Sequence, residues 1–152
     1  MVYVDECGVE EFMTRSHGRT PCGERLNVPK PGRRFKRTNV IAGWSNKTKQ
    51  ILAPYIYSWN TTSAWFMVWF EYMLLPLLLP GTLILLDNAS FHNKAKIRYL
   101  ASLYNCTAVF LPKYSPDLNV IEKYWASLKN WLRLYSKLFK TIQLALKSRL
   151  SM

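Results

Sequence analysis

Two aspartates follow short apolar runs of the sequence. Val2–Val4 leads into Asp5, and Leu83–Leu86 leads into Asp87. If the two runs are neighbouring strands, both carboxylates project at the same edge of the sheet. Sites in open α/β sheets form in the crevice beyond the carboxyl ends of the strands. A third acid, Glu122, falls in the first turn of the last long helix that we expect.

Carboxylates that converge in this way need a cation. Two charges about 4 Å apart cost roughly 4 kcal/mol at an effective dielectric constant near 20. Ligands that are all oxygen, few in number and open to water suit Mg²⁺ or Mn²⁺ rather than zinc. Two such ions can flank a scissile phosphate and stabilise the attacking and leaving oxygens of an in-line displacement. We therefore expect a metal-dependent phosphoryl-transfer site at Asp5, Asp87 and Glu122.

Each acid also has an ordinary structural interpretation. Asp5 can simply end a strand, and Asp87 with Asn88 can form a turn or a helix cap. Asn119 and Glu122 have the spacing of a capping box, with Asn119 as the N-cap. These alternatives stay open for each residue taken alone.

The charge of the chain indicates a polyanionic partner. The 152 residues carry 21 Lys plus Arg against 9 Asp plus Glu, a formal net charge of +12, with a pI near 9.8. Ten of the basic residues lie between Arg15 and Lys49, and seven basic residues and no acid follow Glu122. Such an excess favours nucleic acid first and an anionic membrane surface second. Solvated faces of a protein without such a partner are the ordinary alternative.

The cysteines and the apolar segments argue against several classes of protein. Cys7, Cys22 and Cys106 are odd in number and lack CxxC spacing, which argues against a disulfide framework and a zinc site and fits a reducing compartment. The N-terminus has neither the basic nor the apolar region of a signal peptide. Residues 64–86 are apolar with one charge, but prolines and a glycine divide them into pieces too short for a membrane span.

The length suits one domain with a substantial core. Apolar and turn-forming residues predict strands at Val2–Val4, Thr38–Ser45, Gln50–Trp59, Leu83–Leu86 and Ala108–Leu111. Helices are expected from the caps at Asn60–Thr62 to about Leu75, where Pro76 ends the helix, and at Asn93–Tyr104, Val120–Tyr135 and Thr141–Leu150. The expected apolar faces are Ile97, Leu100 and Leu103 on one helix, and Ile121, Trp125, Leu128, Leu132 and Tyr135 on the next. This order predicts an α/β domain with a mixed sheet and helices on its faces.

Residues 85–132 closely resemble the catalytic domain of the mariner-like bacterial insertion-sequence transposases of the DDE superfamily. The resemblance rests on Asp87-Asn88-Ala89, His92, the loop Tyr114–Asn119 and Ile121-Glu122, with 34 residues between Asp87 and Glu122. Val120 is a departure, because the family usually has proline there.

The resemblance extends to the N-terminal half. Val4-Asp5-Glu6 is similar to the family's first-aspartate strand. The family's next segment is matched by Arg19, Pro21, Gly23 and Arg25, and its central helix by Thr61-Thr62 and Trp69-Phe70-Glu71.

The resemblance implies a ribonuclease-H-like fold over residues 1–152, with Asp5, Asp87 and Glu122 as catalytic, metal-binding triad. It implies Mg²⁺ or Mn²⁺ as cofactor, two ions in number, and double-stranded DNA as partner at the transposon ends and the target. It also implies TA target sites, a homodimer during the reaction, and a bacterial cytoplasmic protein associated with the nucleoid. We expect no membrane partner.

Family members carry an N-terminal helix-turn-helix region that recognises the transposon ends. We expect this region to be absent here, because the sequence starts a few residues before Asp5. The chain is then the downstream product of a split reading frame, a truncated remnant or an excised domain. In the first case a separate protein from an upstream reading frame would supply DNA recognition.

Several further residues are candidates for supporting roles. The expected phosphate contacts are Arg33, Arg34, Lys36, Arg37, Lys113, Lys129 and Arg133. On a helix, Lys129 and Arg133 fall within about 40° of Glu122, although basic residues near a helix C-terminus are also favoured by the helix dipole. Asn88 and His92 are candidates for residues that support the metal ligands.

We therefore predict an enzyme that uses divalent ions to cleave DNA at transposon ends and to join the freed 3′-hydroxyl to target DNA. A structure-specific nuclease without strand transfer, and an inactive remnant that only binds DNA, are the alternatives.

Overall fold

The computed structural model describes residues 1–10, 37–112 and 118–150. In this part of the chain the strands are β1 (Val2–Glu10), β2 (Arg37–Ser45), β3 (Gln50–Tyr57), β4 (Leu83–Leu86) and β5 (Thr107–Phe110). The α-helices are α1 (Ser63–Trp69), α2 (Lys94–Leu103), α3 (Ile121–Tyr135) and α4 (Ile142–Leu150). Their order along the chain is the predicted one.

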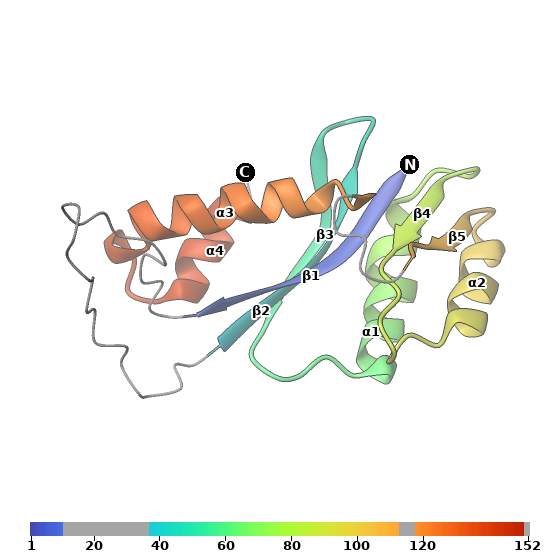
Figure 1. Ribbon diagram of the computed structural model, residues 1–152, viewed down its shortest axis with the longest axis horizontal. Coiled ribbons are helices and arrows are strands. Elements are labelled where there is room, and N and C mark those ends of the chain that lie inside the picture. The colour runs from blue at the N-terminus through green and yellow to red at the C-terminus, as the bar shows by residue number, and fades with distance from the viewer. Residues whose placement is uncertain (11–36, 113–117, 151–152) are drawn as a thin grey trace, which may run out of the picture.

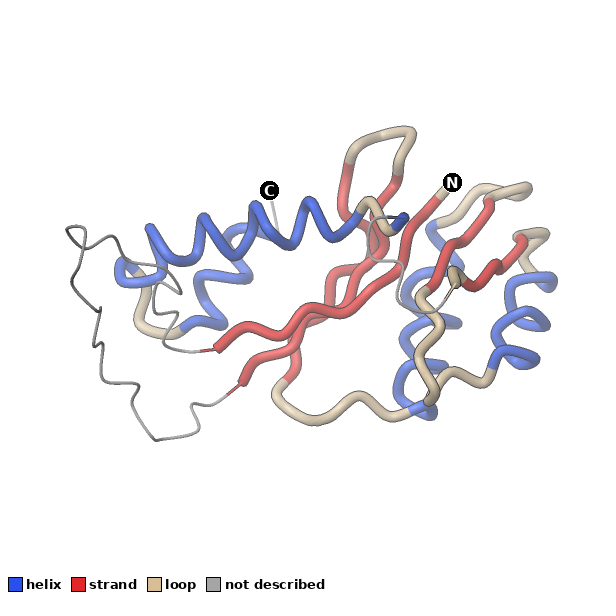
Figure 2. The backbone as a smooth tube through the Cα atoms, in the orientation of Figure 1, coloured by secondary structure: helices blue, strands red, loops and turns tan. Residues whose placement is uncertain are grey.

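The strands form one mixed sheet in the order β3-β2-β1-β4-β5 (Figure 2). β1 pairs antiparallel with β2, and β2 with β3, whereas β1–β4 and β4–β5 are parallel. Val4 lies opposite Leu86 in the parallel pair. The next residues, Asp5 and Asp87, therefore stand level with each other, as the sequence predicted for neighbouring strands.

The helices cover the two faces of the sheet (Figure 1). α1 and α2 pack on one face, where Phe66, Trp69 and Ile97 join the buried side chains of Val4 and Leu86. The buried side chains of α3 and α4 pack on the other face, against Tyr3, Cys7, Val9, Val40 and Ala42. Because strand residues alternate between faces, consecutive residues of β1 contribute to different cores.

β1 is longer than predicted. The strand was expected to end near Asp5, but it continues to Glu10 because β2 pairs with it along its whole length, as far as Glu10 opposite Arg37. Cys7 and Val9 are buried on the face that α3 covers, with less buried residues between them. Asp5 is therefore a mid-strand residue, and the prediction that it ends a strand is wrong.

The predicted helix from Thr62 to Leu75 is divided. Thr62 caps it as expected, since its hydroxyl accepts a hydrogen bond from the Trp65 N–H. The α-helical part ends at Trp69 and continues as a π-helical turn (η1, Phe70–Leu74) and a 3-10 turn (η2, Leu75–Leu77). Pro76 lies inside η2 rather than beyond the end, because the first turn of a helix does not need the N–H group that proline lacks.

The expected apolar faces of the later helices are mostly correct. Leu103 and Tyr135 are exceptions, with 59% and 44% of their surfaces exposed. α2 ends at Leu103, with Tyr104 as the C-cap, and a Schellman turn follows. In this turn Asn105 has a φ of 54°, and the Asn105 and Cys106 N–H groups bond back to Ser102 and Ala101.

Two strand predictions need smaller corrections. β5 is an edge strand with Thr107 and Val109 exposed, and it spans Thr107–Phe110 rather than the predicted Ala108–Leu111. β3 ends at Tyr57, before the predicted Trp59.

Two further expectations concern cysteines and membranes. Cys7 and Cys106 are buried free thiols. Within the described ranges, no helix has the length and apolar character needed to cross a bilayer. Cys22, the segment from Arg19 to Arg25 and the loop residues 114–117 lie outside the described residues.

Candidate active site

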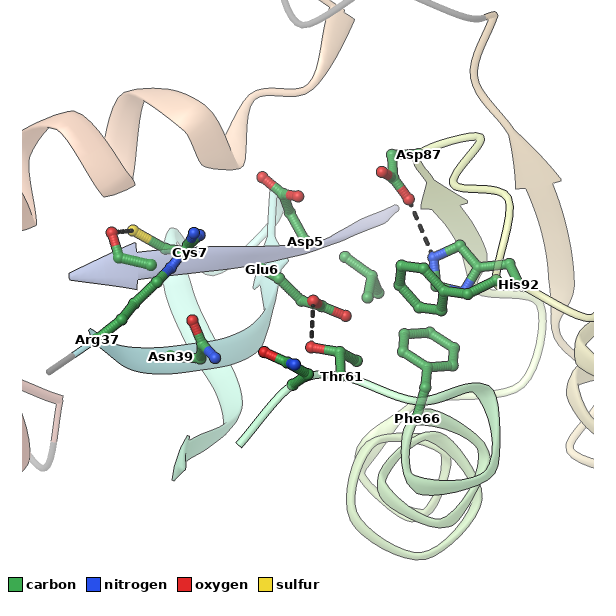
Figure 3. Close-up of a pocket in the computed structure, with 13 residues that line it drawn as sticks. Asp5, Glu6, Cys7, Arg37, Asn39, Thr61, Phe66, Asp87 and His92 are labelled. Carbon is green, nitrogen blue, oxygen red and sulfur yellow. Dashed lines mark hydrogen bonds and ion pairs between the residues drawn. The ribbon is translucent and has the colours of Figure 1, made fainter. Parts of the chain in front are cut away.

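A cleft of about 410 Å³ opens where β1 and β4 lie side by side (Figure 3). Three carboxylates line it: Asp5 and Glu6 of β1, and Asp87 directly after β4. Asp5 and Glu6 are consecutive strand residues, so they project to opposite faces of the sheet. The cleft therefore receives acidic side chains from both sides of β1.

Asp5 lies beneath α3. The Trp125 indole N–H donates a hydrogen bond to its Oδ2 over 3.2 Å. The pKa of Asp5 is raised from 3.8 to about 7, chiefly by burial and also by the negative charges of Glu122 and Asp87, whereas hydrogen bonds from the Glu6 backbone and Trp125 lower it. Ionisation of Asp5 is therefore unfavourable at this position, and a cation bound nearby would stabilise the ionised carboxylate.

Asp87 is the more open of the two aspartates. Half of its side chain is exposed, and its Oδ1 lies 3.0 Å from Nε2 of the buried His92. α2 is capped by Asn93, whose side chain accepts a hydrogen bond from the Lys96 N–H. The cap alternative for Asp87 and Asn88 is therefore wrong. The Oδ1 of Asn88 is buried without a hydrogen-bond partner among the described residues.

Glu122 lies in a separate hollow of about 220 Å³ on α3, with its side chain exposed. The predicted capping box does not form. Val120 is the N-cap residue, and the buried Oδ1 of Asn119 has no hydrogen-bond partner in the part of the chain that the structure describes. Lys129 and Arg133 line the same hollow as Glu122, as the helical spacing predicted.

The ligand atoms in the cleft are of the type that a divalent ion prefers, but three ligands do not converge on one point among the described residues. Asp5 and Asp87 offer oxygen ligands in one cleft, and the charge of Glu122 reaches Asp5. Within residues 1–10, 37–112 and 118–150, however, no three His, Cys, Asp or Glu side chains come close enough to hold an ion together. Glu122, the predicted third ligand, lines a different hollow from Asp5 and Asp87.

Glu6 is a site residue that the sequence reasoning missed. Its Oε2 accepts a hydrogen bond of 2.7 Å from the Thr61 hydroxyl, which in turn lies 2.6 Å from the Tyr57 hydroxyl. Its Oε1 is buried with no partner among the described residues, and burial raises the pKa of Glu6. The signal in the sequence was the pair of consecutive acids, which a strand places on opposite faces.

Of the predicted phosphate contacts, Arg37 lies within the described residues and lines the cleft. Its guanidinium lies directly over Gly8, so that a Cβ atom at Gly8 would collide with it. Glycine at this position therefore gives Arg37 its place in the cleft. The other predicted phosphate contacts Arg33, Arg34, Lys36 and Lys113 lie outside the described residues.

A five-stranded mixed sheet that presents acidic residues from two adjacent strands beside a basic helix is an architecture suited to phosphoryl transfer on nucleic acid. The sequence matches the family model of the DDE superfamily endonucleases over residues 1–144. The chain therefore belongs to this family. No curated protein matches the sequence.

Solved structures of similar fold include two of the Mos1 transposase and one of a viral integrase. One is a Mos1 paired-end complex with the left transposon end (TM-score 0.63, 19% identity, 86% of this chain and 41% of that chain). Another is a Mos1 mariner paired-end complex with Mn (TM-score 0.63, 18% identity, 85% and 41%). The third is the catalytic core domain of BIV integrase (TM-score 0.53, 15% identity, 72% and 70%).

These matches confirm the predicted ribonuclease-H-like fold. The chain spans less than half of the length of the Mos1 chains that it matches.

Proposed function

We propose that this domain cleaves DNA at transposon ends and joins the freed 3′-hydroxyl to target DNA, with divalent ions held by Asp5, Asp87 and Glu122. One observation carries the proposal: Asp5 on β1 and Asp87 directly after the adjacent parallel strand β4 stand level and line one cleft, and the charges of Asp87 and Glu122 both act on Asp5. Membership of the DDE endonuclease family supports it.

Bound ions would supply an activated water and stabilise the charge that develops on the scissile phosphate. The residues of this chain set the conditions for that chemistry. Burial of Asp5 under Trp125 excludes water from one side of the site, and Asp87 faces the open side of the cleft. A manganese-containing Mos1 complex of similar fold supports a divalent ion as cofactor.

The basic residues are proposed to hold the DNA backbone. Arg37 lies within the cleft, and Lys129 and Arg133 lie beside Glu122 on α3. Arg33, Arg34, Lys36 and Lys113 belong to the same proposal from their sequence positions. Such contacts contribute affinity without sequence specificity.

Several finer points belong to the proposal through the family resemblance alone. They are two ions in the site, a homodimer during the reaction, TA targets, and a nucleoid-associated location in a bacterial cytoplasm. Recognition of the transposon ends would come from a region or protein outside these 152 residues.

Nicking of supercoiled DNA by the purified chain tests the proposal. We expect nicking with Mn²⁺ or Mg²⁺ that EDTA abolishes, and a loss of at least 100-fold in Asp5→Asn, Asp87→Asn and Glu122→Gln. Glu71→Gln is the matched control, since it removes a carboxylate from η1, away from the cleft. DNA retention on a filter should be unchanged in all four variants.

The possible outcomes separate the alternatives. Nicking without joined products when a pre-cut end is supplied would indicate a nuclease without strand transfer. DNA binding without metal-dependent nicking would indicate a remnant. Nicking that survives Asp87→Asn would contradict the proposed site itself.

A further inference from the structure

His92 has an unusual combination of burial and hydrogen bonding. Only 4% of its side chain is exposed, yet its Nε2 lies 3.0 Å from the carboxylate of Asp87, of which 51% is exposed. Its other ring nitrogen, Nδ1, is buried and has no hydrogen-bond partner among the described residues. The ring therefore has one hydrogen bond in this part of the molecule, and that bond goes to Asp87 (Figure 3).

The aromatic core fixes the position of this ring. The centroids of the Phe66 and Phe91 rings both lie 4.3 Å from that of His92, and Phe110 lies 6.4 Å away. Phe66 belongs to α1 and has only 1% of its surface exposed. Packing against Phe66 of α1 thus fixes the position of Nε2, although Asp87 itself belongs to an irregular segment between β4 and α2.

The hydrogen bond decides which carboxylate oxygen stays available. Whether the imidazole is neutral or protonated, the nitrogen that faces a carboxylate carries the hydrogen and donates it. Oδ1 of Asp87 is therefore engaged, and no hydrogen bond to Oδ2 is formed by any residue that the structure describes. Hydrogen bonds of this kind orient metal ligands, and their loss typically costs 10- to 100-fold in metal affinity.

We propose that His92 is a positioning residue that fixes the Asp87 carboxylate so that Oδ2 is presented to a divalent ion. The inference rests on the proposed function, because it assigns the ion to the same cleft. The proposal assigns this role to the hydrogen bond alone. The aromatic packing fixes the position of the ring, and the N–H group orients the Asp87 carboxylate.

Two substitutions separate the hydrogen bond from the packing. His92→Phe keeps a ring in the aromatic cluster and removes the donor. His92→Gln removes the ring and retains an amide N–H at nearly the position of Nε2. A merely structural histidine would tolerate Phe better than Gln, whereas the positioning role predicts the reverse order for metal binding.

Mn²⁺ binding to the full chain, measured by electron paramagnetic resonance of the free ion, gives the decisive reading. We expect His92→Phe to bind Mn²⁺ at least tenfold more weakly than the wild type, and His92→Gln to recover most of the loss. Thermal unfolding in EDTA establishes that each variant is folded. If His92→Phe does not fold, His92→Leu, which is smaller and also lacks a donor, replaces it.

Asp87→Asn provides the reference for the proposed function. If the wild type binds Mn²⁺ no better than Asp87→Asn, the metal site fails and the inference fails with it. If Asp87→Asn abolishes binding while His92→Phe binds as the wild type does, or while His92→Gln is as weak as His92→Phe, the inference alone is overturned.

Discussion

Trp125 donates its indole N–H to the carboxylate of Asp5, which lies 120 positions earlier in the chain. The bond fastens α3 to the middle of β1, and the indole is almost completely buried. Glu122 lies one helical turn before Trp125, so the same contact brings the charge of Glu122 within range of Asp5. This hydrogen bond therefore links the α3 part of the proposed site, with Glu122, to the β1 part, with Asp5.

Trp125→Phe removes the donor and keeps an aromatic ring in the core. We expect it to destabilise the protein by about 2 kcal/mol, because a hydrogen bond to a carboxyl group is lost and the smaller ring leaves a gap. Chemical denaturation at pH 8 measures the effect. Trp44→Phe is the control, since the Trp44 N–H is buried without a described partner and its removal breaks no such bond. Equal costs for the two variants would contradict a stabilising role for the Asp5 bond.

The partly buried Asp5 gives the metal-free protein a defined pH dependence. Burial raises its pKa from 3.8 to about 7. The folded state therefore favours the protonated acid, so the stabilising contribution is complete below pH 4 and is lost as the pH rises to about 7. The whole change amounts to about 4 kcal/mol at 1.36 kcal/mol per pKa unit.

Asp5→Asn isolates this contribution, because asparagine resembles the protonated acid and does not titrate. In EDTA, we expect the unfolding free energy of the wild type to fall by about 3 kcal/mol relative to that of Asp5→Asn between pH 5 and pH 8. Urea unfolding of both proteins at several pH values measures the difference. Parallel curves would show that Asp5 ionises as it does in the unfolded chain.

The level positions of Asp5 and Asp87 were predictable because each follows a run of apolar residues, and such runs mark buried strands. α3 was predictable for the same reason, since Ile121, Trp125 and Leu128 repeat at helical spacing. In both cases neighbouring residues in the sequence suffice for the prediction, because the pattern of apolar residues indicates which side chains are buried.

Features that depend on distant partners were not predictable. The extension of β1 beyond Asp5 is set by pairing with β2, across residues 11–36. The hydrogen bond that holds Glu6 in the cleft comes from Thr61, 55 positions away. A local sequence rule predicts that the helix ends before Pro76. The helical segment continues through Pro76 as η1 and η2, because Leu74 and Leu75 pack into the core.

Thr61→Val tests the hydrogen bond to the partly buried Glu6. Thr61 donates its one hydroxyl hydrogen to Glu6, so the Tyr57 hydroxyl donates to Thr61. Valine has nearly the same shape and removes the hydroxyl that donates to Oε2 of Glu6, whose Oε1 already has no partner among the described residues. We expect a loss of about 2 kcal/mol in unfolding free energy, whereas Thr61→Ser, which keeps the hydroxyl, should cost less than half as much. Equal costs for Val and Ser would show that the methyl group, and not the hydrogen bond, matters at this position.

Gly8→Ala tests whether glycine seats Arg37 in the cleft. The added Cβ would collide with the Nε, Cζ and Nη2 atoms of Arg37. These atoms belong to the end of a flexible side chain, so we expect the fold to persist and the guanidinium to leave the cleft. DNA binding by Gly8→Ala should then be as weak as by Arg37→Ala, with the slope of log K against log salt reduced by about one in each.

The double variant and a charge control complete this experiment. Gly8→Ala combined with Arg37→Ala should bind DNA no more weakly than Arg37→Ala alone, because the alanine at Gly8 acts only through Arg37. Lys137→Ala removes one positive charge from the exposed turn η4 (Ser136–Leu138), outside both hollows, and should leave the affinity closer to that of the wild type. If Gly8→Ala keeps the wild-type affinity and salt dependence while Arg37→Ala loses both, the guanidinium reaches DNA from a position that does not need the glycine.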